Sequence, residues 1–305
     1  MSESTPPQKV LSTRDYGADV VLAGHNFDEA YAAAREAEKA SRALFVHPFD
    51  DPLVMAGQGT IGLEVLEELP DLANLIVPIG GAGLISGIAT AIKETHPHVR
   101  VIDVESAAAP SMHYSLKKGR IVETPLAVSL ADGIAVKRVG KNTFPIVQAF
   151  VDEVVLVEEE EIAQAIVAVL ERTKQLVEGA RAMTLAALLN TRVRGLSGKT
   201  LRPVGENIDV RTIAMVVERG LVAAGRYLKL KVELEDLPGS LAMLATDIAT
   251  KKANVHLIAH DRRSIPLPLG KTELKTRGYE HIREVIDHLN GRGYTVSYDS
   301  TFYKS

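Results

Sequence analysis

Cysteine is absent from the 305-residue sequence, which excludes disulfide bonds and thiolate chemistry. Charge of one sign does not dominate either, since the net charge is −4 and the pI is about 6.2. We therefore expect no nucleic acid and no anionic membrane as a partner, because both are bound by strongly basic surfaces. No apolar run approaches the length of a membrane span, MSESTPPQKV lacks a signal-peptide core, and no HExxH motif suggests zinc. These absences predict a cytoplasmic protein.

The remaining composition is that of a globular protein with a sizeable core. Hydrophobic residues make up 46% of the chain, whose length suggests two domains or one large domain with an appendage. Over roughly the first 200 residues strand patterns alternate with helix patterns, which is typical of a parallel α/β sheet. Strands are expected at 20–22, 43–47, 75–79, 99–105 and 152–157, and helices at 27–43, 53–69 and 158–178.

Residues 75–95, LIVPIGGAGLISGIATAIKET, predict a strand, a tight turn and a helix in immediate succession. Gly80, Gly81 and Gly83 leave backbone N–H groups uncovered where the helix begins, and a helix N-terminus is a ready anion site. A phosphate-bearing ligand is one interpretation of this cluster. A turn that needs glycine only for its backbone angles is an equally good one.

Two kinds of phosphate ligand fit the glycine loop. The first is a dinucleotide, because Asp103 and Glu105 follow about twenty residues later and could hold a ribose, although Ser86 replaces the third glycine of that fingerprint. The second is a compact monophosphate cofactor such as pyridoxal phosphate, which needs only the consecutive N–H groups. The loop by itself does not distinguish them.

His47, which has no visible catalytic partner, is expected to pack where the strand expected at 43–47 runs into the turn that follows.

The pattern of the sequence changes near Gly225. GRYLKLKVELED alternates like a half-exposed strand, a helix follows PGS, and ANVHLIAHD predicts a second strand. A short third strand in GKTELKTRG, a helix in YEHIREVIDHLNGRG and a last strand in YTVSYDS complete the order βαββαβ. This order describes a small ferredoxin-like domain, which we expect to be an appended binding or pairing module.

Six stretches of the sequence resemble one enzyme family. They are AGQGTIGLEVLEELP, PIGGAGLISGIA, ADGIAVKRVG, VEGARAMTLAALL, ENIDV and ERGLVAAGRYL. In this order they resemble the medium-length threonine ammonia-lyases (threonine dehydratases), fold-type II pyridoxal phosphate enzymes with a tryptophan synthase β-like core and a C-terminal ACT-like domain. The resemblance implies dehydration of threonine, and more slowly of serine, to 2-oxobutanoate or pyruvate plus ammonia, in amino-acid metabolism and isoleucine biosynthesis.

The resemblance also implies which residues bind pyridoxal 5'-phosphate. The glycine loop would wrap the cofactor phosphate, and Glu178 matches a glutamate near the cofactor ring. Val204 stands where the family has a serine that usually hydrogen-bonds the pyridine nitrogen, a bond that valine cannot make. The implied cofactor-binding positions are Gly80, Gly81, Ala82, Gly83, Glu178, Val204 and Asn207.

No catalytic residue is assigned, because the lysine that forms the Schiff base in this family is missing from the 305 residues. The family carries it in an SFKxRGA context, and the SxGNHA loop that follows is missing too. MSESTPPQKV resembles an internal family segment, MPESTPPQKV, so we expect Met1 to be an internal methionine and the chain to lack the N-terminal catalytic segment. Without that lysine there is no positioned base for the substrate α-proton.

The family comparison divides the chain into three parts. Residues 1–55 would be the remainder of a small domain that covers the cofactor, 56–225 the large cofactor-binding α/β domain, and 226–305 the ACT-like regulatory domain. Serine racemases among the relatives bind a divalent cation beside the glycine loop, and the matching positions here include Glu105 and Ala109. ACT domains often bind an amino acid after their first strand. That match gives Asp236, Gly239 and Asn254 as effector-binding positions.

The leading hypothesis is therefore a threonine ammonia-lyase that works on a small-molecule amino acid and forms a homo-oligomer. A second hypothesis is a non-catalytic remnant that senses an amino acid or pairs with a full-length subunit, because the Schiff-base lysine is absent. A third is a dinucleotide-binding oxidoreductase, which rests on the near-match of the glycine loop and on Asp103.

Overall fold

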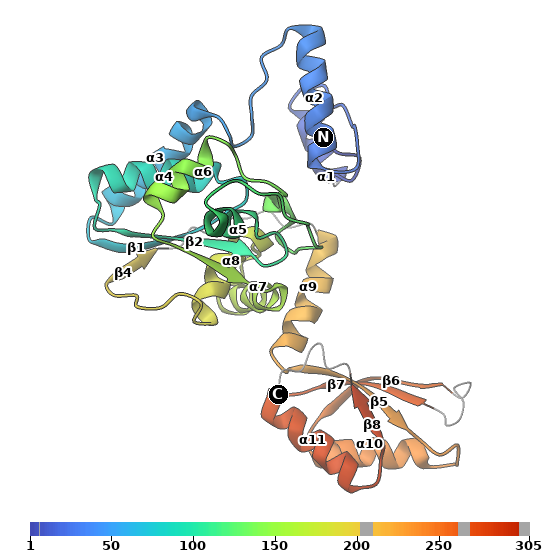
Figure 1. The fold of residues 1–305 in the computed structure, drawn as a ribbon. Coiled ribbons are helices and arrows are strands. Elements are labelled where there is room, and N and C mark those ends of the chain that lie inside the picture. The colour runs from blue at the N-terminus through green and yellow to red at the C-terminus, as the bar shows by residue number, and fades with distance from the viewer. Residues whose placement is uncertain (6, 202–209, 262–268, 299–305) are drawn as a thin grey trace. The chain divides into compact units, whose positions relative to one another are not determined.

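The computed structural model describes residues 1–305 except 6, 202–209, 262–268 and 299–305. The chain forms two compact units (Figure 1), the first made of residues 1–159 and 178–209 and the second of residues 160–177 and 210–305. Each unit contains its own sheet. No helix in the described part of the chain combines the length and the apolarity needed to cross a membrane.

A parallel sheet forms the centre of the first unit. Its described strands lie in the order β3-β2-β1-β4, and all neighbouring pairs are parallel. β1 and β2 are almost entirely buried, as expected for strands that are covered on both faces. The parallel α/β sheet predicted from the sequence is confirmed. The strands are β1 (Leu72–Pro78), β2 (Arg100–Ser106), β3 (Glu153–Val157) and β4 (Lys199–Leu201).

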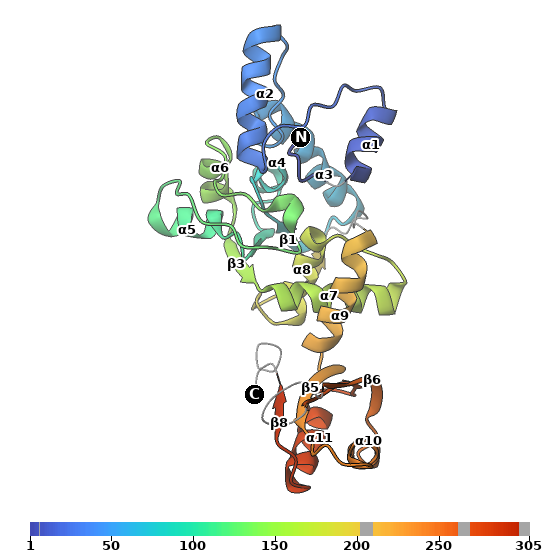
Figure 2. The same ribbon diagram turned by 90° about the vertical axis from the view of Figure 1, so that its right-hand side faces the viewer.

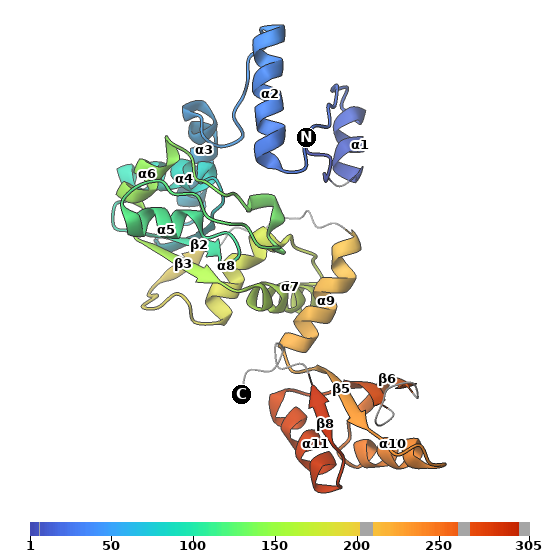
Figure 3. The ribbon, with the colours of Figure 1, turned by 45° about the vertical axis from the view of Figure 1, so that its right-hand side comes forward.

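Helices cover both faces of this sheet (Figures 2 and 3). α3, α4 and α6 lie on one face and α8 on the other, where it contacts β1, β2 and β3. α3 and α4 pack closely because α3 presents small residues: a Cβ on Gly59 would stand 3.1 Å from the carbonyl oxygen of Gly87 in α4. The helical segments of this unit after residue 50 are α3 (Pro52–Glu68), α4 (Gly83–Thr95), α5 (Ser111–Lys118), η1 (Asp132–Ile134), α6 (Thr143–Phe150) and α8 (Gly179–Leu189).

The N-terminal segment holds α1 (Pro7–Asp15) and α2 (Phe27–Ser41). Asn26 caps α2 as predicted, its side chain accepting a hydrogen bond from the Glu29 N–H. The strands predicted at 20–22 and 43–47 are wrong, because both segments lack strand structure. A strand needs a hydrogen-bonded neighbour, and these two pair with none of the described strands. Their apolar side chains remain exposed, as the 88% exposure of Leu44 shows.

The second unit contains an antiparallel sheet in the order β6-β7-β5-β8. With the chain order βαββαβ, this is the ferredoxin-like topology that the sequence predicted. α10 and α11 both cover one face of the sheet (Figure 3), and the alternating residues Leu228, Leu230 and Val232 of β5 are buried in the core with them. The elements are β5 (Tyr227–Glu233), α10 (Ser240–Thr250), β6 (Asn254–Asp261), β7 (Leu269–Lys275), α11 (Tyr279–Gly291) and β8 (Val296–Tyr298).

Two further helices, α7 (Glu159–Thr173) and α9 (Val210–Ala223), contribute to this unit. They pack closely at Gly220, where a Cβ would stand 2.7 Å from the carbonyl oxygen of Ala163. The Gln164 side chain donates a hydrogen bond to the carbonyl of Ala223, at the end of α9. α9 therefore packs on α7 just before the chain enters β5.

Candidate functional site

The loop between β1 and α4 places a row of backbone N–H groups at a helix N-terminus. Gly80, Gly81, Ala82 and Gly83 are all buried, and Ala82 adopts the left-handed conformation with a φ of 75° as the N-cap residue. Within the described residues, the N–H groups of residues 80–85 donate to no acceptor. Buried N–H groups almost always have a partner, and the helix dipole adds positive charge here. The loop is therefore suited to hold an anion.

Close packing explains the glycines of this loop. A Cβ on Gly81 would stand 2.4 Å from ring carbons of Phe49, and one on Gly83 would stand 2.8 Å from the Phe49 backbone. A Cβ on Gly80 would stand 2.3 Å from the carbonyl oxygen of Ile134. All these distances are too short for a real side chain. None of these three glycines has a φ in the left-handed region, so the interpretation that they serve only the backbone angles of a turn is wrong. They are required by packing, and the row of free N–H groups is a separate feature of the same loop.

Thr143, at the start of α6, fixes the loop from the side of that helix. Its buried hydroxyl donates a 2.9 Å hydrogen bond to the carbonyl oxygen of Gly81. The Ser86 hydroxyl, in the first turn of α4, donates to the Thr143 carbonyl oxygen at 3.4 Å. Sequence reasoning missed Thr143, because 62 residues separate it from Gly81 and no local pattern marks the contact.

Glu178 is connected to the glycine loop by contacts of both with the short segment η1. It is the N-cap residue of α8, and a Cβ on Gly133 would stand 2.7 Å from its carboxylate oxygen. The next residue, Ile134, lies against Gly80. Loss of hydration on burial raises the pKa of Glu178, against the lowering effect of Lys9 and Arg181. The structure thus brings the glycine loop and Glu178 together around η1.

Glu105, one of the two predicted metal-binding positions, caps helix α5. Its carboxylate oxygens accept hydrogen bonds from the N–H groups of Met112 at 2.7 Å and His113 at 2.8 Å. Burial raises its pKa to about 7, although these hydrogen bonds act in the opposite direction. No cluster of three or more His, Cys, Asp or Glu residues that could hold a metal is found in the described ranges. A metal at Glu105 and the Ala109 carbonyl stays a prediction.

Asp103, also in β2, is completely buried. Both of its carboxylate oxygens lack a hydrogen-bond partner among the described residues. Burial, assisted by the nearby Glu105 carboxylate, raises the pKa of Asp103 well above its usual range. A carboxylate that binds a ribose must be reached by the ligand, so this position does not support the dinucleotide interpretation.

The other predicted positions are separate from the glycine loop in the sequence. Gly239 is the N-cap residue of α10 with a φ of 96°, and nothing lies within 4 Å of the Cβ that an added side chain would have. Asp236 precedes it and Asn254 begins β6, and all three positions are exposed. Val204 and Asn207 lie outside the described residues. These effector and cofactor contacts stay predictions.

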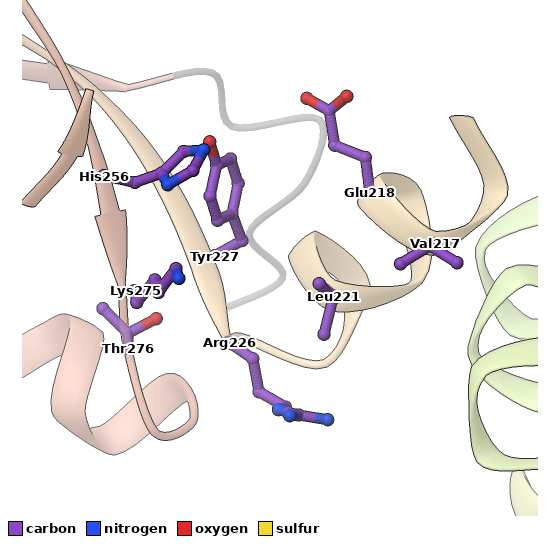
Figure 4. A pocket seen from close by; sticks show the side chains of 8 residues that line it. All are labelled: Val217, Glu218, Leu221, Arg226, Tyr227, His256, Lys275 and Thr276. Carbon is purple, nitrogen blue, oxygen red and sulfur yellow. The ribbon is translucent and has the colours of Figure 1, made fainter. Parts of the chain in front are cut away.

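The second unit also contains a cavity of about 510 Å³ between α9 and the strands β5, β6 and β7 (Figure 4). The rings of Tyr227 and His256 meet edge to face in its lining, with 5.7 Å between their centroids. None of the predicted effector positions lines this cavity. Its lining residues are Val217, Glu218, Leu221, Arg226, Tyr227, His256, Lys275 and Thr276.

Comparison with known proteins identifies the class of this protein. The sequence model of the family described as pyridoxal-phosphate dependent enzyme matches residues 1–201. Among solved structures, the processed form of threonine deaminase isoform 2 from Solanum lycopersicum matches with a TM-score of 0.66 and 35% identity. The match covers 72% of this chain and 65% of that one. The fold is thus that of a pyridoxal 5'-phosphate enzyme.

Two curated relatives narrow the identification. An L-threonine ammonia-lyase of Geobacter sulfurreducens is 73% identical over 301 residues, and one of Thermotoga maritima is 44% identical over 302 residues. Each match covers 97% of this chain and 75% of the relative. The chain belongs to the pyridoxal-phosphate-dependent threonine ammonia-lyases. This confirms the family and the fold type that the sequence motifs predicted, and it confirms the cofactor that they implied.

Proposed function

We propose that these 305 residues supply the cofactor phosphate site and a regulatory domain of a threonine ammonia-lyase. The complete enzyme would convert L-threonine to 2-oxobutanoate and ammonia, and L-serine more slowly to pyruvate and ammonia. The observation that carries this proposal is the row of N–H groups at residues 80–85 without acceptors in the described structure. A phosphate dianion would satisfy several of these donors at once, and the dipole of α4 would favour its charge.

The residues around the loop fit the cofactor in distinct ways. Bound pyridoxal 5'-phosphate supplies an electron sink for the negative charge left when the substrate loses its α-proton. Gly80, Gly81, Ala82 and Gly83 would hold its phosphate. Phe49 and Thr143 keep the loop in shape through the contacts described above. Glu178, joined to the loop through η1, would contact the ring, and burial raises the pKa of its carboxyl.

The proposal includes the organisation of the whole chain. Residues 1–55 would belong to a small domain covering the cofactor, 56–225 to the cofactor-binding domain and 226–305 to an ACT-like regulatory domain. Asp236, Gly239 and Asn254 would bind an amino-acid effector, and Glu105 with Ala109 a divalent cation. The enzyme would act in the cytoplasm as a homo-oligomer. The ferredoxin-like topology of residues 226–305 supports the regulatory assignment of this part, because such domains commonly pair or bind small ligands.

A second candidate function is a sensor or partner subunit without catalysis of its own. The observation that favours it is the absence of the SFKxRGA lysine motif from the 305 residues. In this case the residues 226–305 would bind an amino acid while the glycine loop served only as structure. The two candidates differ in whether the loop binds the cofactor and whether a lysine-bearing segment restores turnover.

The experiment is to measure keto-acid release from L-threonine with added pyridoxal 5'-phosphate, first with the 305-residue chain alone. The second sample contains the chain co-expressed with the part of the Geobacter sulfurreducens relative that lies outside the match. We expect turnover to appear or to rise strongly in the second sample, because that part would supply the lysine. Absence of keto-acid release from both samples would overturn the enzyme proposal and leave the sensor.

A further inference from the structure

Asp50 makes an unusual number of hydrogen bonds to one helix N-terminus. Its carboxylate accepts from the backbone N–H groups of Lys141 at 2.9 Å, Asn142 at 2.8 Å and Thr143 at 3.2 Å. The Asn142 side chain donates back to the Asp50 carbonyl oxygen at 3.2 Å. The first N–H groups of a helix have no partner inside the helix, and a negative charge there is favoured by the dipole. Asp50 thus caps α6 from more than ninety residues away in sequence.

The segment before α6 is shaped to admit this carboxylate. A Cβ on Gly140 would stand 2.4 Å from a carboxylate oxygen of Asp50 and 2.6 Å from the Thr143 hydroxyl. Any larger residue would therefore push Asp50 away from the helix end. On the other side, the N–H groups of Phe49 and Asp50 donate to the His47 ring nitrogen Nδ1, at 3.2 and 2.8 Å. The turn that presents Asp50 is accordingly held by its own hydrogen bonds.

The capped helix end is also the part of α6 that touches the glycine loop. Thr143, whose N–H donates to Asp50, donates its hydroxyl to Gly81 and accepts from Ser86. A continuous path of hydrogen bonds therefore leads from the Asp50 carboxylate through Thr143 to the loop. Phe49, the residue before Asp50, packs directly on the same loop.

We infer that Asp50 is a positioning residue for the cofactor loop: it holds the N-terminus of α6 so that Thr143 can fix Gly81 and the first turn of α4. This inference rests on the proposed function only in naming the anion as a cofactor phosphate. The role of Asp50 in holding the loop in shape does not depend on which anion binds there. The row of N–H groups can converge on one anion only while the peptide carrying Gly81 keeps its orientation.

The neighbouring Asp51 offers a matched control. It too caps a helix, because its side chain accepts from the N–H groups of Leu53 at 2.8 Å and Val54 at 3.2 Å at the start of α3. Asp50 and Asp51 are both half-buried. Loss of either cap should therefore cost comparable stability, whereas only Asp50 is connected to Thr143.

The test compares Asp50→Ala, Asp50→Asn, Asp51→Ala and wild type in the whole chain. Hydrogen exchange measures how fast the backbone amides of residues 140–145 and 79–92 exchange. Calorimetry measures the affinity for pyridoxine 5'-phosphate, which lacks an aldehyde and so cannot react with surface lysines. For Asp50→Ala we expect faster exchange in both segments and an affinity loss of about 5- to 20-fold, as one to two lost hydrogen bonds would produce. Asp50→Asn, which keeps one acceptor oxygen, should fall in between, and Asp51→Ala should leave both readouts unchanged.

The outcomes separate the inference from the proposed function. Faster exchange confined to 140–145 in Asp50→Ala would overturn the inference, as would equal effects of Asp50→Ala and Asp51→Ala on 79–92. If wild type binds no pyridoxine 5'-phosphate while exchange in Asp50→Ala still spreads to 79–92, the positioning role stands and the cofactor assignment fails. Should Asp50→Ala not fold, Asp50→Asn carries the same comparison.

Discussion

Phe49 lies so close to Gly81 that a Cβ on Gly81 would stand 2.4 Å from its ring carbons. The two residues belong to segments that precede α3 and follow β1. Their contact joins the turn in front of α3 to the loop that we assign to the cofactor phosphate. The shape of the loop is therefore determined partly by a residue far from it in sequence.

Gly81→Ala should destabilise the chain by about 1–3 kcal/mol, because the added methyl group overlaps the Phe49 ring. Combining it with Phe49→Ala should recover part of that loss, since the smaller side chain removes the overlap. Urea unfolding of the two single variants and the double variant measures this coupling. As a control, Gly57→Ala on the exposed side of α3, with nothing within 4 Å, should stabilise by about 0.5–1 kcal/mol. Strict additivity of the Phe49 and Gly81 effects would contradict the account.

His47 should make the stability depend on pH in a predictable direction. Burial lowers its pKa in the folded protein, and its unprotonated Nδ1 accepts two backbone hydrogen bonds. The folded state therefore binds a proton less readily than the unfolded state, whose histidine titrates near pH 6.5. The stabilisation is present above that pH and is lost as the pH falls through the folded pKa.

The measurement is the difference in unfolding free energy between wild type and His47→Asn at pH 7.5 and pH 5.5. Asparagine retains an acceptor but cannot be protonated in this range. We expect wild type to lose more stability than the variant on acidification. An equal loss in both proteins would show that His47 does not contribute.

Asp103→Ala should stabilise the protein by about 1–3 kcal/mol, because both oxygens of the buried carboxyl lack hydrogen-bond partners among the described residues. Asp71→Ala is the control, since Asp71 forms an exposed ion pair with Lys199 at 2.8 Å and such pairs contribute little. Thermal or urea unfolding compares the two variants. A marked destabilisation by Asp103→Ala would mean that the carboxyl makes stabilising contacts in the folded chain and would contradict this prediction.

The regulatory assignment predicts that isoleucine, valine or threonine raises the melting temperature. A ligand present at 100 times its Kd stabilises the folded state by about 2.7 kcal/mol. Asn254→Ala should abolish the shift, whereas Glu218→Ala, on the α9 side of the cavity in the second unit, should leave it unchanged. Loss of the shift only in Glu218→Ala would move the effector site to that cavity.

Local patterns sufficed for much of the architecture. The glycines after β1, the buried run of Arg100–Ser106 and the alternation in Tyr227–Glu233 each reflect short-range periodicity, and the structure contains the corresponding elements. The same reasoning failed at 20–22 and 43–47. Their composition is strand-like, but strand formation depends on a neighbour that the local sequence does not specify.

The supporting contacts of the site could not be predicted in this way. Thr143 and Gly81 are 62 residues apart, and Asp50 and Thr143 are 93 residues apart. Neither pair belongs to a motif with fixed spacing. Gly80, Gly81 and Gly83 were recognised because glycine at a strand-to-helix turn has few explanations, whereas threonine and aspartate at loop positions have many.

The most direct test of the cofactor site is a calorimetric titration of the purified chain with pyridoxine 5'-phosphate and with pyridoxine. The two compounds differ only in the phosphate, and neither carries an aldehyde that could react with lysine. If the N–H groups of residues 80–85 hold the phosphate, the phosphorylated compound should bind at least about 10- to 100-fold more tightly, as charge-assisted hydrogen bonds imply. Inorganic phosphate should compete with it. Equal affinity for both compounds, or no binding of either, would contradict the assignment of this loop.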